Sequence, residues 1–363
     1  MQRFEECPEE VRDKIFSYLT IQDFKNASLV SKHWYNLIGQ SKLCMRKLRI
    51  NKCDCFEDFE SILNSNRQYQ HLTLMIEQSE LKKNTKYLRV LRDIVEKFSE
   101  SLLYLKISQD LKLKDDLLKL KELQIVLNNE IRLPVNFIVS NGLITKAINL
   151  KKLLIKFHNF DAKSLQYIRD AILMHESLKI LEMETHHIIQ ELNQNDIKLK
   201  LYEIHLNYGG KPLKAFEQFF DTQISSLQVI DIPLEKNFIN YFISKFPKLH
   251  TLIIIFALYS AYEKQMEQEN FEYTKNWSIK KLIIKGYFTK ENHMFFHACE
   301  IIKKFLNLQE IEFEYLNPGM LPHLNDCQSL KVVKYKHLNF KFPQSQNDVM
   351  TQHERLKFVQ IEH

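Results

Sequence analysis

The sequence predicts an α/β protein in which a small helical unit at the N-terminus precedes a long repeat solenoid, a parallel sheet lined by helices. Three observations lead to this prediction. A short apolar pattern recurs along most of the chain, whereas the first fifty residues lack it and show the spacing of short helices. Only 6 of the 363 residues are glycine, so the fold cannot depend on many tight glycine turns.

Three short helices are predicted between Pro8 and Gly39. Pro8 lies where the first helix would begin, and its missing N–H costs nothing at that position. Val11, Ile15 and Leu19 then recur every four residues and form one apolar stripe. Two further short helices would follow, and Gly39 would end the last one. A unit this small buries little surface, so it must pack on the following domain, on a partner, or on both.

This stretch resembles an F-box, which typically reads Leu-Pro, an acidic–aliphatic pair, Ile, Leu, a second such pair, and Val-Cys/Ser-Lys/Arg-x-Trp. Cys7 departs from the usual leucine and would reduce the contact area with an adaptor. The resemblance covers about 40 residues. The positions that match the motif are Pro8, Glu10, Val11, Ile15, Leu19, Asp23, Phe24, Val30, Ser31, Lys32 and Trp34.

The resemblance implies that residues 1–48 bind the Skp adaptor of a cullin–RING ubiquitin ligase, while the remainder selects a substrate. Trp34 would instead hold the small unit to its own core or to the first repeat. Ile15→Asp or Leu19→Asp should abolish adaptor binding, because either places a charge in an apolar contact. The residues expected to bind the adaptor are Pro8, Val11, Ile15, Leu19 and Val30.

Residues 49–363 carry a loose L-x-x-L-x-L pattern. Eleven steps lead from its first copy at Tyr69 to its last at Leu356, so the mean period is about 26 residues, which lies within the range of leucine-rich repeats. The domain therefore resembles the leucine-rich-repeat domain that commonly follows an F-box. The copies are Tyr69-Leu72-Leu74, Leu102-Leu105-Ile107, Leu120-Leu123-Ile125, Leu150-Leu153-Ile155, Leu178-Leu181-Met183, Leu201-Ile204-Leu206, Leu227-Ile230-Ile232, Leu249-Leu252-Ile254, Ile279-Leu282-Ile284, Leu308-Ile311-Phe313, Leu330-Val333-Tyr335 and Leu356-Val359-Ile361.

Each copy predicts a half-buried strand, and amphipathic stretches between copies predict helices that cover the buried side. The repeat is irregular: the steps vary from 18 to 33 residues, and the asparagine or cysteine that usually follows the strand is mostly absent. The 18-residue step after Leu102 leaves little room for a helix, and 317–329 and 339–355 are expected to be irregular. The predicted helices are Tyr87–Phe98, Ala162–Met174, Leu213–Phe220, Phe238–Phe246 and His293–Phe305.

Charged residues alternate in sign across the late strands. If neighbouring strands align at the same motif position, Lys281 lies beside Glu310 and Glu312 beside Lys334. This part of the open face would then be self-neutralised and a poor surface for a highly charged substrate. A further row of alternating sign would contain Lys285, Glu314, Lys336 and Glu362.

An apolar patch is predicted on the open face of the middle strands. Ile253, Ile255 and Ile283 would lie together there, with Asp231 and Lys281 at the rim. A central apolar cluster with a polar rim is typical of a recognition surface, so these five residues are the candidate substrate-binding site. Two alternatives are a covering segment, such as 257–276 or a late loop, and a strand phase assigned wrongly.

Other signals favour a protein-binding function in the cytoplasm or nucleus. The net charge of +6 is mild and argues against a nucleic-acid binder, and the six cysteines form no disulfide framework. No apolar run is long enough to predict a membrane span. Cys53-Asp54-Cys55 and the pair His293 and His297 lack the residues that would complete a metal site, and we expect neither metal nor cofactor.

The predicted function is therefore that of a non-catalytic, substrate-recognition subunit of a Skp–cullin–F-box ubiquitin ligase, a component of the Ubl conjugation pathway that works by protein–protein interaction. No nucleophile motif or phosphate loop indicates an enzyme. One alternative is a leucine-rich-repeat scaffold that uses its F-box without ubiquitin transfer. A nucleic-acid-associated repeat protein would need clustered arginine, which the chain lacks, and a hydrolase is disfavoured for want of a nucleophile.

Overall fold

The computed structural model describes residues 7–17, 26–27, 29–40, 47–50, 57–64, 68–76, 85–126, 142–156, 162–183, 187–192, 198–206, 213–233, 236–255, 273–286, 293–338 and 355–361. These residues form mixed α/β structure. The chain divides into two compact units, Met1–Leu178 and Lys179–His363.

Two of the three helices predicted between Pro8 and Gly39 are described, and most of the second one lies outside the described residues. Helix α1 (Glu9–Ser17) starts directly after Pro8, whose carbonyl accepts hydrogen bonds from the amides of Val11 and Arg12 at 3.0 and 3.1 Å. Helix α3 (Lys32–Gln40) is capped by Ser31, whose Oγ accepts a hydrogen bond from the Trp34 amide at 3.1 Å. The prediction for Gly39 was wrong, because Gly39 lies inside α3 rather than beyond its end.

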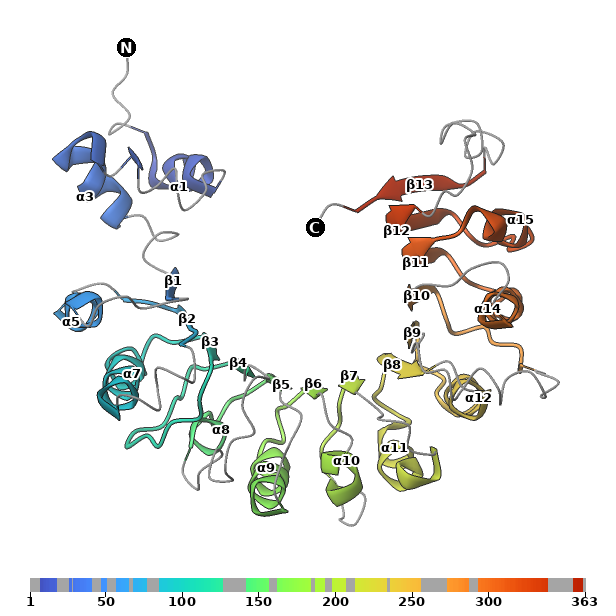
Figure 1. Cartoon of the computed structure of the whole chain (residues 1–363), viewed down its shortest axis with the longest axis horizontal. Helices are drawn as coiled ribbons and strands as arrows, with labels where there is room; N and C mark the ends of the chain where they lie inside the picture. Colours follow the sequence, from blue (N-terminus) through green and yellow to red (C-terminus); the bar gives the residue numbers. More distant parts are fainter. Residues whose placement is uncertain are drawn as a thin grey trace. The chain divides into compact units, whose positions relative to one another are not determined.

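The first unit continues as a parallel sheet whose strands pair in sequence order, each with its successor. Helices α7, α8 and α9 lie on one side of this sheet (Figure 1). The strands are β1 (Lys47–Ile50), β2 (His71–Leu74), β3 (Tyr104–Ile107), β4 (Glu122–Val126) and β5 (Lys152–Lys156). The helices are α5 (Glu57–Asn64), α7 (Thr85–Lys97), α8 (Leu143–Lys146) and α9 (Ala162–Met174).

The second unit repeats this strand–helix alternation, again with parallel pairing in sequence order. Its strands are β6 (Ile180–Met183), β7 (Glu203–Leu206), β8 (Val229–Pro233), β9 (Thr251–Ile255), β10 (Lys281–Lys285), β11 (Glu310–Leu316), β12 (Val332–Leu338) and β13 (Lys357–Gln360). Its helices are α10 (His187–Leu192), α11 (Glu217–Gln223), α12 (Lys236–Lys245), α14 (His293–Lys304) and α15 (Leu321–Asn325), with 3-10 turns η2 (Leu213–Ala215) and η3 (Pro318–Met320).

The repeat pattern predicted the strands correctly, because each of the twelve copies coincides with one of β2–β13. In β2–β12 the second and third apolar positions are buried, as for Leu72 and Leu74 at 0% exposure, and the residues between them face the open side. Strand β1 was not predicted. Strand β1 spans the domain boundary that the sequence predicted between residues 48 and 49. That boundary stays a prediction.

The predicted helices correspond to α7, α9, α11 with η2, α12 and α14. The short step after Leu102 indeed has no helix between β3 and β4. The expectation of irregular structure over 317–329 was wrong, because η3 and α15 form there and bury Leu321 and Leu324. The other region expected to be irregular, 339–355, lies outside the described residues except for Arg355.

The register prediction holds for three late strands and fails for the last. Lys281 pairs with Glu310, and Glu312 with Lys334, as expected. Strand β13 is displaced by one residue, because Val333 pairs with Phe358 instead of Val359. Phe358 and Val359 are adjacent and both apolar, so alternation along this strand favours neither phase. Glu362, the predicted partner of Lys336, lies outside the described residues.

Side-chain hydrogen bonds connect successive repeats just ahead of five strands. The side chain just before the first apolar position supplies them: the Oγ atoms of Ser101, Ser177 and Ser329 each donate to a carbonyl of the preceding repeat at 2.8 Å. Asn149 and Asn307 make the same kind of bond with their Nδ2 atoms. These serines and asparagines therefore connect adjacent repeats through side-chain hydrogen bonds to the backbone.

Candidate functional site

The N-terminal helices expose large apolar side chains, which a folded domain normally buries in its core. Val30 is 74% exposed, Val11 46% and Ile15 41%, and Leu29 and Tyr35 are exposed as well. Eleven large apolar side chains are exposed among the described residues of the chain, and these five lie in its first 35 residues. A concentration of this kind indicates a binding surface.

The same helices also have a small core of their own. Phe16, Leu37 and Ile38 are buried, and the Trp34 ring meets the Phe16 ring edge-on with centroids 6.5 Å apart. Trp34 thus connects α3 to α1, which agrees with its expected role in holding the unit together. Of the five predicted adaptor-binding residues, Pro8, Val11, Ile15 and Val30 are exposed, and Leu19 lies outside the described residues.

In the second unit, the sheet brings the five predicted substrate-binding residues onto one open face. The register places Asp231, Ile253 and Ile283 side by side across β8, β9 and β10. Ile255 follows on β9 and Lys281 on β10. The patch is less open than predicted, since Ile253 and Asp231 are each only 5% exposed, whereas Ile255 and Ile283 are half-buried.

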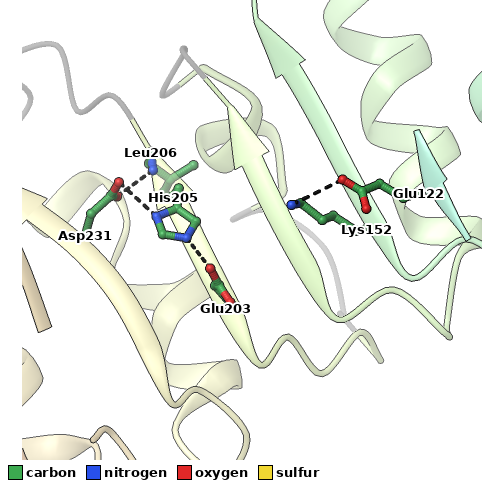
Figure 2. Close-up of polar contacts among 6 residues, drawn as sticks. All are labelled: Glu122, Lys152, Glu203, His205, Leu206 and Asp231. Atoms are coloured by element: carbon green, nitrogen blue, oxygen red, sulfur yellow. Dashed lines mark hydrogen bonds and ion pairs between the residues drawn. The ribbon is translucent and has the colours of Figure 1, made fainter. Parts of the chain in front are cut away.

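Asp231 is held by a polar cluster that also contains Glu203 and His205 of β7. His205 Nδ1 lies 3.1 Å from Asp231 Oδ2, and its Nε2 contacts Glu203 Oε1 (Figure 2). The other Asp231 oxygen accepts a hydrogen bond from the Leu206 amide at 2.7 Å. The paired positions of β7 and β8 end at Ile204 and Ile230, so this carboxylate connects the strands beyond the end of the backbone ladder.

Electrostatics keep the His205 ring charged. Burial by itself lowers the pKa of His205, but hydrogen bonds and charge from Asp231 and Glu203 outweigh this effect and raise the pKa to about 9. The imidazolium therefore donates to both carboxylates at neutral pH. The cluster is fully satisfied internally, so it fixes Asp231 in place rather than presenting a free carboxylate to a ligand.

Ion pairs connect the late strands: Lys281 contacts Glu310 as the sequence predicted, whereas Lys334, expected to pair with Glu312, also contacts Glu310. Lys281 Nζ lies 2.8 Å from Glu310 Oε1 and 3.4 Å from Glu312 Oε2, and Lys334 Nζ lies 2.9 Å from Glu310. Burial raises the pKa of Glu310, but the two lysines outweigh it and the net shift is downward. Glu314, expected beside lysines, accepts a hydrogen bond from the Gly286 amide at 2.7 Å.

The sequence reasoning missed Glu203 and His205. Both occupy outward positions of the copy Leu201-Ile204-Leu206, next to the outward position of Asp231. Alignment of the outward positions of neighbouring strands predicted the charged residues of β10–β12. The same alignment, begun at β7, would have placed His205 and Glu203 next to Asp231. A histidine between two carboxylates is the signal that was available.

Two buried cysteines of the second unit are poorly suited to nucleophilic chemistry. Burial raises the pKa of Cys299 to about 12 and that of Cys327 to about 11, so both thiols stay protonated at neutral pH. Among the described residues no group of three or more His, Cys, Asp or Glu side chains could hold a metal ion. Cys53 and Cys55 lie outside those residues. His293 and His297 both lie on α14.

No helix in the described parts of the chain combines the length and apolar character needed to cross a membrane.

Comparison with known families gives one result. Residues 4–46 match the F-box domain, which agrees with the motif and with the exposed apolar surface of α1 and α3. F-box domains bind Skp-type adaptors and are generally found in non-catalytic substrate adaptors, so the match supports an F-box protein. No curated protein matches the chain.

Proposed function

We propose that this chain is a substrate-recognition subunit of a Skp–cullin–F-box ubiquitin ligase. The F-box binds the Skp adaptor, and the repeats, which resemble leucine-rich repeats, bind a protein substrate. The chain itself makes and breaks no covalent bond. It increases the effective concentration of the substrate at a ubiquitin-charged enzyme.

The observation that supports the adaptor-binding half is the exposure of Val11, Ile15 and Val30 within the stretch that matches the F-box. Phe16 and Trp34 hold the helices together from the other side. The exposed residues can therefore be changed without removing the small core that positions them.

Ile15→Asp and Val30→Asp should each weaken binding of the purified Skp adaptor, measured by calorimetry, by about 100-fold or more, since each buries a charge in an apolar contact. Leu118→Asp is the matched control, because Leu118 is also exposed and apolar but lies outside the F-box. It should bind the adaptor normally. Unchanged affinity in both F-box variants would remove the basis of the proposal, and adaptor binding without ubiquitin transfer in a reconstituted ligase would favour the scaffold alternative.

Substrate binding is proposed for the open face of the middle strands, at Ile255, Ile283 and Lys281, with the almost fully buried Asp231 and Ile253 beside them on the same face. Ile255→Lys with Ile283→Lys should reduce the ubiquitinated proteins that co-purify with the ligase, while the unfolding temperature stays within a few degrees. Ile253→Lys is unsuitable, because Ile253 is buried and a lysine there should destabilise the unit. Phe296→Lys, on the exposed side of α14, is the control. Equal co-purification from both variants would exclude the patch.

The expected location, cytoplasm or nucleus, stays a prediction that a fluorescent fusion of the full chain can check.

A further inference from the structure

At the C-terminal ends of the late strands, the charged residues pair differently from the sequence prediction. Glu314 was expected between Lys285 and Lys336. Its Oε2 atom instead accepts a hydrogen bond from the Gly286 amide at 2.7 Å. Gly286 directly follows β10 and has a φ of 103°, a left-handed conformation that favours glycine. The turn after β10 therefore supplies the donor that holds the Glu314 carboxylate.

The two lysines of this row are left accessible. Lys285 is exposed and Lys336 is half-buried. Neither lysine makes an ion pair within the part of the chain that the structure describes. Among the described residues of the row, two positive charges stand against the single negative charge of Glu314, so a net positive charge remains.

The charges nearer the start of the same strands are matched from within. Lys281 and Lys334 both contact Glu310, and Lys281 also lies 3.4 Å from Glu312 Oε2. On the open face of β10–β12, the lysines that stay available to a ligand are therefore those at the C-terminal ends of β10 and β12.

Apolar side chains continue this row on the other side of Lys285. The register places Lys285 beside Ile255, and Ile255 beside Pro233. Ile255 and Pro233 are half-buried, as is Ile283 on the same face of β10, so part of each side chain reaches solvent. The row thus changes from apolar on β8 and β9 to positive on β10 and β12.

We infer that this row binds an extended segment of the protein substrate in which two acidic side chains lie on one side of an apolar side chain. The inference rests on the proposed function and gives its substrate site a chemical class. The apolar side chain packs against Ile255 and Pro233, and the carboxylates contact Lys285 and Lys336. Complementary charge then fixes how the segment lies across the strands.

The spacing of the strands sets the positions of the acidic residues. Neighbouring strands are about 4.8 Å apart, so Lys285 lies about 5 Å from Ile255, and Lys336, two strands further, about 10 Å beyond Lys285. An extended segment that crosses the strands advances about 3.3 Å per residue. Acidic residues about two and five positions from the apolar residue would therefore meet the two lysines in turn.

The test uses the full chain and a fluorescent peptide about nine residues long, with one leucine and with aspartates two and five residues after it. The comparison probes are its asparagine counterpart, a permuted peptide with the leucine between the two aspartates, and single-stranded DNA of equal charge. At low salt, we expect the aspartate peptide to bind about tenfold more tightly than the asparagine peptide, and more tightly than the permuted one. The preference for aspartate should shrink as salt increases.

Lys285→Gln with Lys336→Gln should remove most of the preference for aspartate, and Lys285→Arg with Lys336→Arg should retain it. The matched control is Lys248→Gln with Lys280→Gln, because both of these lysines are exposed and lie just ahead of β9 and β10, at the opposite ends of the strands. The control should bind the aspartate peptide normally.

Equal binding of the aspartate and asparagine peptides, equal binding of the permuted peptide, tighter binding of DNA, or an equal loss in the control would overturn the inference. Adaptor affinity, measured separately, should be the same in all variants. A chain that fails to bind the adaptor but keeps the peptide preference would refute the proposed function alone, and normal adaptor binding without any peptide preference would refute this inference alone.

Discussion

At the scale of single residues, Asp231 shows how a side chain can be placed correctly by sequence and still have another role. The strand pattern put it at the rim of a substrate patch. In the structure its carboxylate is occupied by His205 and by the Leu206 amide, and it is almost fully buried. Asp231 therefore fixes β7 to β8, and it can affect a ligand only through the position of that strand pair.

The raised pKa of His205 predicts a specific dependence of stability on pH. A histidine whose pKa rises from 6.5 to about 9 on folding stabilises the fold fully below pH 6.5, and this contribution is lost as the pH rises through about 9. Urea unfolding of the wild type and His205→Gln should therefore differ most near pH 6. The difference should fall by roughly 2–3 kcal/mol by pH 10.

Ser329→Ala serves as the control for this prediction, because it removes a hydrogen bond between repeats of the same unit without changing a titratable group. Its effect on the free energy of unfolding should vary little over the same pH range. A difference between wild type and His205→Gln that is constant from pH 6 to pH 10 would show that the imidazolium is not stabilised by the two carboxylates.

Gly142 shows a second residue-level effect, in which the absence of a side chain matters more than backbone freedom. Its φ of −79° is open to any residue. A Cβ atom there would lie 2.1 Å from Asp110 Oδ2, and Asp110 is buried and accepts hydrogen bonds from the Leu111 and Leu143 amides. Glycine at this position therefore leaves room for the Asp110 carboxylate, which accepts a hydrogen bond from the amide of Leu143, the first residue of α8.

At the scale of elements, the apolar periodicity was sufficient to predict the buried face of each strand that has a neighbouring strand on both sides. Leu105 and Ile107, for example, are separated by a half-exposed lysine, so only one face of β3 can be buried. For β13 the adjacent Phe358 and Val359 leave two registers with similar burial, and the sequence cannot choose between them. Strand β1 escaped notice, although Met45, Leu48 and Ile50 have the spacing of the repeat with methionine in the first position.

The binding surfaces could be predicted less completely than the strands. Exposure of Ile15 and Val30 follows from their place in a unit too small to bury them. Burial of Ile253 does not follow from β9 alone, because it depends on the side chains that surround it on the open face. Alternation along a strand says which way a side chain points, and not how much space its neighbours leave.

The ion pairs that connect β10, β11 and β12 predict a measurable effect. Glu310 lies between Lys281 and Lys334, so Glu310→Gln removes both contacts and leaves two lysines close together. We expect a loss of about 1 kcal/mol in the free energy of unfolding, because these partly exposed pairs are screened by solvent. This loss should be smaller at roughly 0.5 M salt, where dissolved ions screen the ion pairs strongly.

Glu300→Gln is the matched control, since Glu300 contacts Lys303 on the exposed side of α14 at 3.0 Å. A single pair on a helix surface should contribute at most about 0.5 kcal/mol. If the two variants lose equal stability at low salt, the three-strand network contributes nothing beyond an ordinary surface pair.

At the scale of the whole chain, the F-box match and the repeats meet at β1. The match ends at residue 46, and β1 begins at Lys47 and pairs with β2 over four residues. The Met75 amide also donates to the Ile50 carbonyl at 2.8 Å. Although no repeat was predicted there, β1 is structurally the first strand of the repeat sheet, and it covers the edge of β2.

This arrangement predicts different outcomes for two truncated chains. A chain that starts at Lys47 loses the F-box but keeps β1, whereas one that starts at Asn51 also exposes the β2 edge and the contacts of Leu48 and Ile50. Both should fail to bind the Skp adaptor in a pull-down. The shorter chain alone should lose about 2 kcal/mol of unfolding free energy in urea, which corresponds to the half-buried apolar surface of two side chains. Equal stability of the two chains would mean that β1 does not stabilise the sheet. Adaptor binding by either chain would mean that the exposed surface of α1 and α3 is not the adaptor site.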